Sequence, residues 1–372
     1  MRVLHIQKVK GIGGSERHLL ALLPALLDRG VDVGMVVVAT GDHLRFVQPL
    51  RDAGIEPRII AAGRDLDLSL TPKLRAAVSS FGATLVHTHL VHADVYGQPA
   101  ARLAGVRGVS TFHSLSPLLR RPAYRVAAVA AGRLARRSIA ISEVVRRAVE
   151  SFGIPRRDSV RVVPYGIDVE GRRLAPAARA AARATFDLRD DDVAVTVAAR
   201  LIEGKGHDVV VEAVRAALGD APTLKLLIAG DGPERAALEA RARSLPAGVT
   251  RFLGFVEDTR DLIGASDVVA FPTLPSLGEG FGLTALEAMA AGVPVVAADT
   301  GALPEVVADR RTGIVVPAGS SPALAAALAR LARDPSERGR LGAAGLERAR
   351  SEFSLAAMTD RTIAVYEEAI AG

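Results

Sequence analysis

Two glutamates stand eight residues apart in a glycine-rich segment of the second half of the chain. Glu279 lies in the loop-like sequence 275–282, and Glu287 lies in the helical pattern that follows. A helix rises about 1.5 Å per residue, so positions eight apart are separated by roughly 12 Å at most, which approximates the span from sugar to ribose across a nucleotide diphosphate. The unpaired N–H groups of Phe281 to Thr284, where the helix begins, suit the phosphates. This context predicts that Glu279 faces a sugar and that Glu287 reaches ribose hydroxyls.

Two basic residues form a second candidate site. Arg200 and Lys205 lie five positions apart in a loop that follows a strand-like run. A guanidinium offers a planar fork of donors and an ammonium offers a point charge, so together they suit a diphosphate. Lys205 is also one of only five lysines in an arginine-rich chain. We predict a diphosphate clamp, with an ordinary solvent-exposed loop as the alternative.

A glycine-rich turn near the start of the chain is the third candidate. The sequence from Lys10 to Glu16 follows the first strand-like run and opens the first helical pattern. Glycines there let the backbone approach a ligand at a helix N-terminus, which favours anions. The turn is not GxGxxG, and no convincing ribose-binding acid follows the second strand, which disfavours a nicotinamide enzyme. A tight turn that simply needs glycine is the alternative.

The elements that must position these loops form two series. Strand-like apolar runs alternate with helical patterns, which is typical of doubly wound parallel sheets, and the alternation restarts after a polar linker that ends near residue 184. We predict an α/β protein with two Rossmann-like domains facing a cleft, where open sheets bind ligands at the carboxyl ends of their strands. The predicted domains are 1–165 and 166–352, followed by a terminal helical segment, 353–372.

Composition excludes several classes of protein. The chain has 372 residues, of which 49% are apolar and 24% charged, as in a folded globular protein. It has no cysteine, which excludes disulfide scaffolds, zinc-thiolate sites and cysteine nucleophiles. No signal-peptide pattern opens the sequence, and the longest run without Asp, Glu, Lys or Arg, 76–93, contains three histidines. We therefore expect a cytoplasmic protein without a membrane span.

The positive charge is concentrated in one region. Residues 100–170 contain 13 arginines against 5 acidic residues, in a chain whose net charge is +6. The absence of Trp and of interleaved aromatic residues argues against nucleic acid. The segment Ser116 to Arg137 mixes Leu, Tyr and Val with six arginines, so we predict docking on an anionic membrane surface. A solvated arginine-rich surface is the alternative.

Three closely spaced histidines resemble a metal-binding cluster. On a strand, residues two positions apart lie on the same face, so His87 and His89 share one face. His92 could reach that face only if a loop brought it back. We therefore expect no metal at this triplet.

Motifs along nearly the whole chain resemble those of the retaining glycosyltransferases of family 4, which have the GT-B fold. The similarity implies a nucleotide-sugar donor held mainly by the C-terminal domain, an acceptor held by the N-terminal domain, and a terminal helix that crosses back to the first domain. Two positions depart from the family pattern, Ala199 for a glycine and Tyr165 for an asparagine, without casting doubt on activity. The motifs are Gly13-Gly14-x-Glu16, Pro164-x-Gly166-x-Asp168, Arg200 with Lys205-Gly206, Ala229-Gly230-Asp231-Gly232-Pro233, Gly254-Phe255-Val256, and Glu279-Gly280-Phe281-Gly282 with Glu287-Ala288.

The resemblance also assigns roles to particular residues. His113 ends a strand of the first domain and corresponds to a histidine that touches the donor sugar or acceptor in similar family members, so Glu16 and His113 are expected on the acceptor side. The expected catalytic residues are His113, Glu279, Arg200 and Lys205. The expected donor-binding residues are Gly13, Gly14, Arg200, Lys205, Gly230, Phe255, Gly280, Phe281, Gly282, Leu283, Thr284 and Glu287.

We therefore predict transfer of a hexosyl-type group, with retention, from a UDP- or GDP-sugar to a glycan, a lipid-linked acceptor or a small molecule. Arg200 and Lys205 are expected to stabilise the departing diphosphate in place of a metal, so no cofactor and no essential metal are expected. Whether Glu279 is a nucleophile or only orients the sugar stays open at this point. The alternatives are an epimerase or phosphorylase of the same fold, and a non-catalytic sugar-nucleotide binding subunit.

Overall fold

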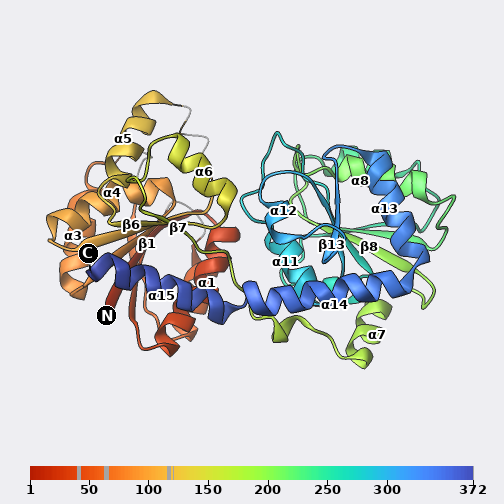
Figure 1. Cartoon of the computed structure of the whole chain (residues 1–372), viewed down its shortest axis with the longest axis horizontal. Helices are drawn as coiled ribbons and strands as arrows, with labels where there is room; N and C mark the ends of the chain where they lie inside the picture. Colours follow the sequence, from red (N-terminus) through yellow and green to blue (C-terminus); the bar gives the residue numbers. More distant parts are fainter. Residues whose placement is uncertain (40–42, 63–66, 115–118, 120, 372) are drawn as a thin grey trace. The chain divides into compact units, whose positions relative to one another are not determined.

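The computed structural model describes residues 1–39, 43–62, 67–114, 119 and 121–371 (Figure 1). Two units are distinguished by their internal contacts. The first comprises Met1–Gly166 together with Leu355–Gly372, and the second comprises Ile167–Ser354. The final helix therefore belongs to the first unit, as the family resemblance implied.

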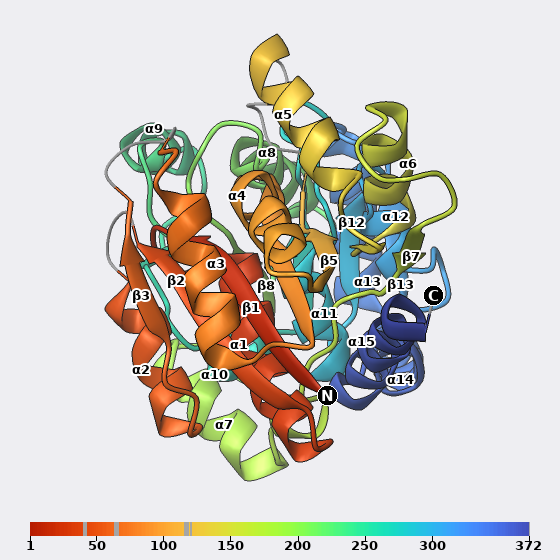
Figure 2. The same cartoon turned by 90° about the vertical axis from the view of Figure 1, so that its left-hand side faces the viewer.

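A seven-stranded parallel sheet forms the centre of the first unit (Figure 2). The strand order is β3-β2-β1-β4-β5-β6-β7, and every neighbouring pair is parallel. Its central strands β1, β2, β4 and β5 are buried along most of their length, polar residues included, as in a sheet covered on both faces. The strands are β1 (Arg2–Val9), β2 (Asp32–Ala39), β3 (Arg58–Ala61), β4 (Leu85–His89), β5 (Arg107–Phe112), β6 (Arg137–Ala140) and β7 (Val160–Val162).

Helices cover both faces of this sheet. The leucines of α1 pack with α2 and with Met358, Val365 and Tyr366 of α15 on one face, while α3 and α4 pack on the other. Tyr366 is completely buried, so the terminal helix is part of this core. The helices are α1 (Gly14–Asp28), α2 (Leu44–Asp52), α3 (Leu70–Phe81), α4 (Leu90–Leu103), α5 (Pro122–Gly132), α6 (Glu143–Ser151) and α15 (Leu355–Ala371).

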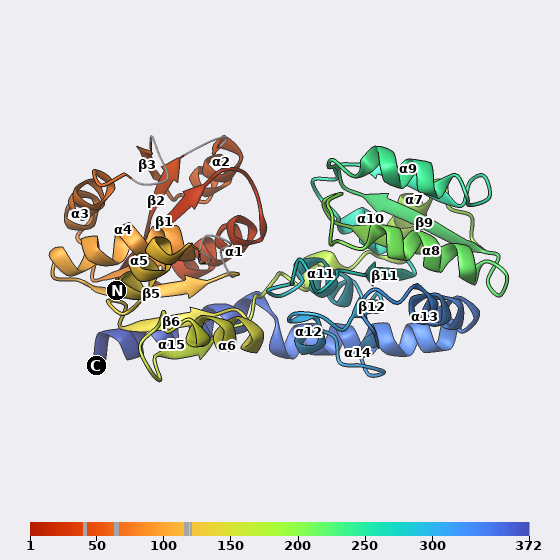
Figure 3. The ribbon, with the colours of Figure 1, turned by 90° about the horizontal axis from the view of Figure 1, so that it is seen from above.

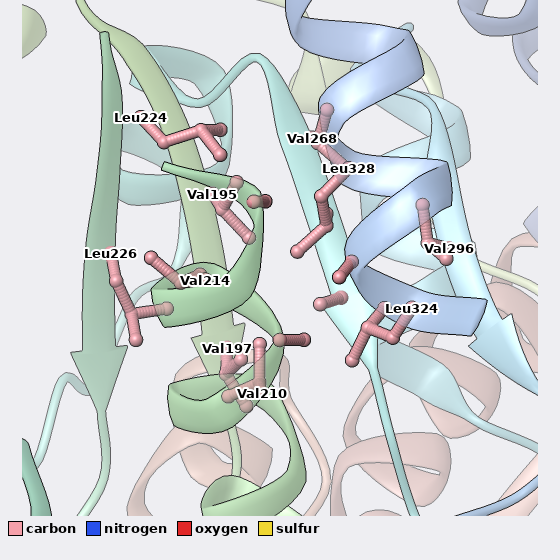
Figure 4. Packing of buried hydrophobic residues seen from close by; sticks show 14 of the residues in the cluster. Val195, Val197, Val210, Val214, Leu224, Leu226, Val268, Val296, Leu324 and Leu328 are labelled. Carbon is pink, nitrogen blue, oxygen red and sulfur yellow. The ribbon is translucent and has the colours of Figure 1, made fainter. Parts of the chain in front are cut away.

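The second unit contains a six-stranded parallel sheet in the order β10-β9-β8-β11-β12-β13. Helices flank its strands (Figure 3), and Figure 4 shows α8 and α13 packed on Val195, Val197, Leu226 and Val268. The strands are β8 (Val193–Ala198), β9 (Leu224–Ala229), β10 (Thr250–Gly254), β11 (Val268–Phe271), β12 (Val295–Ala298) and β13 (Gly313–Val316). The helices are η2 (Glu170–Arg172), α7 (Pro176–Thr185), α8 (His207–Ala217), α9 (Arg235–Ala242), α10 (Arg260–Ala265), α11 (Leu283–Ala290), α12 (Leu303–Val306), α13 (Ser321–Arg333) and α14 (Pro335–Glu352).

Both sheets reverse their strand order once. In the first unit the chain builds outward from β1 to β3 and then resumes on the other side of β1 with β4; in the second, β11 resumes beside β8. At such a point the loops that follow the two adjacent strands lead in opposite directions, which leaves room for a ligand. The prediction of two doubly wound parallel sheets is confirmed, and the reversals select the loops after β1, β4, β8 and β11.

Candidate functional site

An ion pair joins the two loops at the strand-order reversal of the second unit. Lys205 follows β8, Glu279 follows β11, and Lys205 Nζ lies 2.8 Å from Glu279 Oε2. The two side chains are only 14% and 19% exposed, so water screens the pair less than a surface pair. The ammonium also lies 5.7 Å from the centre of the Phe271 ring. Two residues predicted separately from sequence are thus brought into contact.

Backbone packing holds these loops in place. Gly206 has φ +73°, and a Cβ at this position would lie 2.0 Å from the carbonyl oxygen of Pro272. Only glycine fits both the left-handed backbone and the close approach. Leu274 N also donates to Gly204 O at 2.7 Å, which joins the two loops a second time. The position of Lys205 beside Glu279 is therefore fixed by main-chain contacts.

Arg200 lies at the same edge of the sheet, just after β8. Its side chain is exposed and has no hydrogen bond or ion pair with any other described residue. The loop after β9 packs against it, because a Cβ on Gly230 would lie 1.9 Å from the carbonyl oxygen of Ala199. Phe255, at the end of β10, is 62% exposed. A guanidinium without a described partner and an exposed aromatic ring thus follow strands of the same sheet, and their contact with a ligand stays a prediction.

The N-terminus of α11 contributes main-chain donors. Gly282 is its N-cap with φ +100° and provides no side-chain cap, and Leu283 and Thr284 form the first turn. The first N–H groups of a helix have no acceptor within the helix and carry the positive end of its dipole, so this turn suits an anion. Phe281 is buried and its ring packs at 5.8 Å, edge to face, on Phe353. Only the backbone of Phe281 is therefore placed to meet a ligand.

Glu287 lies one helical turn further along α11 and is buried. Its Oε1 lies 3.2 Å from Arg172 Nη2, and its Oε2 accepts a hydrogen bond from Thr259 Oγ1 at 3.0 Å. These contacts fix the orientation of the carboxylate. The sequence identified Glu287 but not these two partners, which come from distant segments. The ribose contact stays a prediction.

In the first unit, the glycine turn after β1 is held by Glu16. Glu16 Oε2 accepts from Gly13 N at 2.9 Å and from Ser15 Oγ at 3.0 Å, and Oε1 accepts from Gln7 Nε2 at 2.5 Å. Gly13 and Gly14 begin α1, so the carboxylate caps the helix and fixes the turn. The structure therefore gives Glu16 a positioning contact beside the predicted ligand loop.

His113 follows β5 and belongs to a buried chain of hydrogen bonds. Its Nδ1 lies 2.6 Å from the hydroxyl of Tyr165, and its Nε2 lies 3.1 Å from Nδ1 of His89. His89 Nε2 in turn lies 3.0 Å from Nδ1 of His5. The ring of His18, from α1, packs 5.2 Å from the ring of His113. The expected acceptor-side histidine is thus linked by hydrogen bonds to Tyr165, His89 and His5 and packs against His18, four residues that the sequence does not identify as site residues.

The predicted histidine triplet separates in the structure. His87 forms hydrogen bonds with Tyr366 of α15 and Thr111 of β5, whereas His92 lies on α4 with its ring 5.2 Å from that of Tyr96. For His5, His18 and Tyr165 the sequence offers little signal, because each lies in a different segment. In the sequence, Tyr165 is only a departure from the family pattern. In the structure, its hydroxyl is a hydrogen-bond partner of His113.

Burial governs the titration of these histidines. Removal from water disfavours the charged imidazolium and lowers the pKa of His5 and His18 to about 3, with His18 adding a repulsive contribution at His5. The same burial holds the pKa of His89 and of His113 well below the ordinary range, and repulsion from neighbouring histidines lowers both further. All four rings are therefore neutral at pH 7.

Comparison with known proteins gives concordant matches. The family model described as Glycosyltransferase Family 4 matches residues 12–170, and the one described as Glycosyl transferases group 1 matches residues 192–334. The D-inositol 3-phosphate glycosyltransferase of Saccharomonospora viridis is 36% identical over 318 residues, covering 77% of this chain and 70% of that protein. The phosphatidyl-myo-inositol mannosyltransferase of Mycobacterium leprae is 30% identical over 367 residues, covering 95% and 93%.

Solved structures share the same fold. HepE of Anabaena, crystallised in complex with UDP, has a TM-score of 0.88 and 23% identity, covering 99% of this chain and 100% of its own. Within the described parts of this chain, we find no helix with the length and apolar character needed to cross a membrane.

The buried histidines predict acid sensitivity. Their folded pKa lies below the unfolded value of about 6.5, so between these two pH values the unfolded chain binds more protons and stability falls as pH falls. His5 and His18, with folded pKa values of about 3, should each cost up to about 2 kcal/mol between pH 7 and pH 5. Urea unfolding across this range should show the loss.

Matched variants distinguish the source of this acid sensitivity. His18→Phe should reduce the pH dependence by the contribution of one histidine, whereas His43→Ala, at a partly exposed position outside the cluster, should leave it unchanged. Stability that stays flat from pH 7 to pH 5 would contradict the assignment of neutral buried rings.

Proposed function

This chain belongs to glycosyltransferase family 4 and is a nucleotide-sugar-dependent glycosyltransferase; from that premise we propose that it transfers a hexosyl group with retention of configuration. The observation that carries the assignment is the Lys205–Glu279 pair, 2.8 Å long, at the strand-order reversal of the second unit. Around it lie the free guanidinium of Arg200 and the N-terminus of α11, which together match a diphosphate attached to a sugar.

The proposed chemistry places positive charge where the leaving group develops negative charge. As the sugar–phosphate bond breaks, Arg200 and Lys205 stabilise the departing diphosphate, and the N–H groups of Leu283 and Thr284 add main-chain donors. These groups perform the task that a divalent metal performs in other transferases, so we propose that transfer needs no metal. Glu279, held by its ion pair with Lys205, orients the sugar hydroxyls, while Glu287 binds the ribose.

The acceptor side is assigned to the first unit. We propose that His113, backed by Tyr165 and by His89, contacts the sugar or the acceptor hydroxyl near the Gly13-Gly14 turn. The relatives named above act on D-inositol 3-phosphate and on phosphatidyl-myo-inositol, and HepE was crystallised with UDP. HepE supports a UDP-sugar donor, and the names of the two relatives support a polyol phosphate or lipid-linked acceptor, among the glycan, lipid and small-molecule acceptors expected from the sequence.

The alternative functions are not favoured. A phosphorylase of this fold needs a lysine for pyridoxal phosphate near the C-terminal helices, and the sequence has no lysine after Lys225. An epimerase or a binding subunit is not what the matched relatives are named for.

A surface of the first unit supports membrane docking. On and beside α5, Val126 is 69% exposed and Leu134 is 41% exposed, with the side chains of Arg121, Arg125 and Arg133 exposed next to them. Of the predicted segment 116–137, residues 116–118 and 120 lie outside the described residues. We propose that this surface binds anionic phospholipid at the cytoplasmic face, because exposed apolar groups and arginines together suit a headgroup region.

The diphosphate clamp predicts a loss of turnover. Replacing Arg200 or Lys205 by alanine should lower kcat by on the order of 10²-fold, the scale of one charge-stabilising donor. Lys225→Ala is the matched control, because Lys225 lies near the amino end of β9, at the opposite edge of the sheet. Steady-state kinetics with the preferred donor tests this, and near wild-type turnover in both clamp variants would contradict the assignment.

Replacing Glu279 and replacing Glu287 should have different effects on turnover and on donor binding. Glu279→Gln should depress kcat with little change in donor affinity, whereas Glu287→Gln should weaken donor binding. Because Glu287 also contacts Arg172 and Thr259, the decisive comparison is UDP against 2′-deoxy-UDP by calorimetry. The wild type should prefer the ribonucleotide and Glu287→Gln should lose that preference. An unchanged preference would show that Glu287 does not bind the ribose.

Membrane docking predicts charge-dependent vesicle binding. At low salt the chain should float with vesicles containing anionic phospholipid, and the triple change of Arg121, Arg125 and Arg133 to Gln should abolish flotation. A control with the same change of charge replaces three exposed arginines of the second unit, Arg243, Arg260 and Arg310. Equal loss in both triple variants, or no flotation of the wild type, would argue against this surface.

A further inference from the structure

Five histidine rings gather inside the first unit. His5 belongs to β1, His18 to α1, His87 and His89 to β4, and His113 follows β5 directly, and all five are buried. We propose that three of them, His18, His89 and His113, form a binding site for a divalent transition-metal ion, with Zn²⁺ as the expected occupant.

Distances among the ring nitrogens fit such an ion. One nitrogen of each of the three residues lies within 4.8 Å of those of the other two. Zinc–nitrogen bonds of about 2.0–2.1 Å at tetrahedral angles place ligand nitrogens about 3.4 Å apart. His89 Nδ1 and His113 Nε2 are already 3.1 Å apart. His18 Nδ1 is buried without a hydrogen-bond partner among the described residues, so His18 offers a nitrogen that no other group uses.

Each outer nitrogen has a hydrogen-bond partner that can fix the tautomer, as metal-bound histidines usually do; here the partners are an imidazole and a phenol hydroxyl. His89 Nε2 donates to His5 Nδ1 at 3.0 Å, and His113 Nδ1 donates to the Tyr165 hydroxyl at 2.6 Å, when these nitrogens carry the protons. This tautomer leaves His89 Nδ1 and His113 Nε2 with lone pairs for the ion. Each ring keeps one proton, so the ion replaces the hydrogen bond between the rings by a change of tautomer and releases no proton.

A second set of three histidines in the same cluster is less suited to binding an ion. His5, His87 and His89 also have nitrogens within 4.8 Å of one another. However, His87 uses Nδ1 for Tyr366 and Nε2 for Thr111, both at 2.7 Å. Binding an ion there would break a hydrogen bond of His87 to Tyr366 or Thr111, whereas in the first set only the bond between the two ligand rings His89 and His113 is replaced and His18 has none at Nδ1 to lose. The structure therefore favours the set that includes His18.

The ligand chemistry selects the class of ion. Three neutral imidazoles without a carboxylate or a thiolate suit Zn²⁺, Co²⁺, Ni²⁺ or Cu²⁺ and do not suit Mg²⁺ or Ca²⁺, which prefer oxygen ligands. Three protein ligands leave a fourth tetrahedral position for water. His18 and His113 retain slight exposure, 7% and 6%, which provides the side from which an ion enters.

Binding has a functional consequence that rests on the proposed function. Contact with sugar or acceptor needs His113 Nε2 to leave His89 Nδ1, and an ion bound to both nitrogens prevents this. Zn²⁺ is therefore expected to inhibit a transferase whose own chemistry needs no metal, and a chelator should restore activity.

The test is a titration of the untagged full chain with Zn²⁺ by calorimetry, and with Co²⁺ by visible absorption. We expect one ion per chain and a Co²⁺ spectrum of tetrahedral type. His18→Phe should lose the site, and Tyr165→Phe, which removes only the outer hydroxyl, should weaken binding about 10–100-fold. His43→Ala is the matched control and should bind as the wild type does. Absence of 1:1 binding, or equal binding by His18→Phe, would overturn the proposal.

Two further measurements separate a metal effect from a folding effect. Because His18 Nδ1 has no described partner, His18→Phe should keep its metal-free melting temperature, and Zn²⁺ should raise the Tm of the wild type but not of this variant. Binding without inhibition would support the metal site and count against the role of His113. Inhibition without 1:1 binding would overturn the metal site and leave the proposed function intact.

Discussion

The reversal of strand order is the constraint on which both candidate sites depend. A parallel sheet that grows outward in both directions from its first strand has one place where neighbouring strands are followed by loops that diverge. In the second unit this place lies between β8 and β11, and the Lys205–Glu279 ion pair joins the two loops there. The left-handed Gly206 allows the loop after β8 to approach Pro272 after β11, and Gly230 allows the loop after β9 to approach Ala199 after β8. The positions of Arg200 and of α11 follow from the same packing.

The strand-order reversals of the two units have the same topology but differ in charge: one is lined by charged groups and the other by neutral groups. At the reversal in the second unit, charged groups remain partly exposed, and one guanidinium has no described partner, so the edge is prepared for an anion. In the first unit, residues from β1, β4 and β5 place neutral imidazoles in a buried cluster. Burying a charge without a partner is costly. Burial therefore lowers the pKa values of these histidines and keeps their rings neutral. One edge is therefore suited to phosphate, and the other to hydroxyl groups or a soft cation.

The arginines that make the first unit basic have two different roles. Arg137 pairs with Glu368 of the terminal helix at 3.0 Å, and Arg161 pairs with the same carboxylate at 2.9 Å. These arginines help to attach α15 to the edge of the sheet. In contrast, Arg121, Arg125 and Arg133 are exposed around α5. Counting charges along the chain does not separate these two groups, because the distinction depends on a helix more than 200 positions away.

The sequence alone determined the class of fold and most of the candidate residues, because periodicity and glycine-rich turns are local properties. Apolar runs alternating with helical patterns predicted both parallel sheets, and Arg200, Lys205, Glu279 and Glu287 were identified from loop context. Tertiary structure decided which groups meet: Lys205 and Glu279 are 74 positions apart, and His113 and Tyr165 are 52 apart. It also decided that His18 and not His92 joins the cluster. Such pairings arise from the packing of distant elements around a shared core, and no local pattern along the chain encodes them.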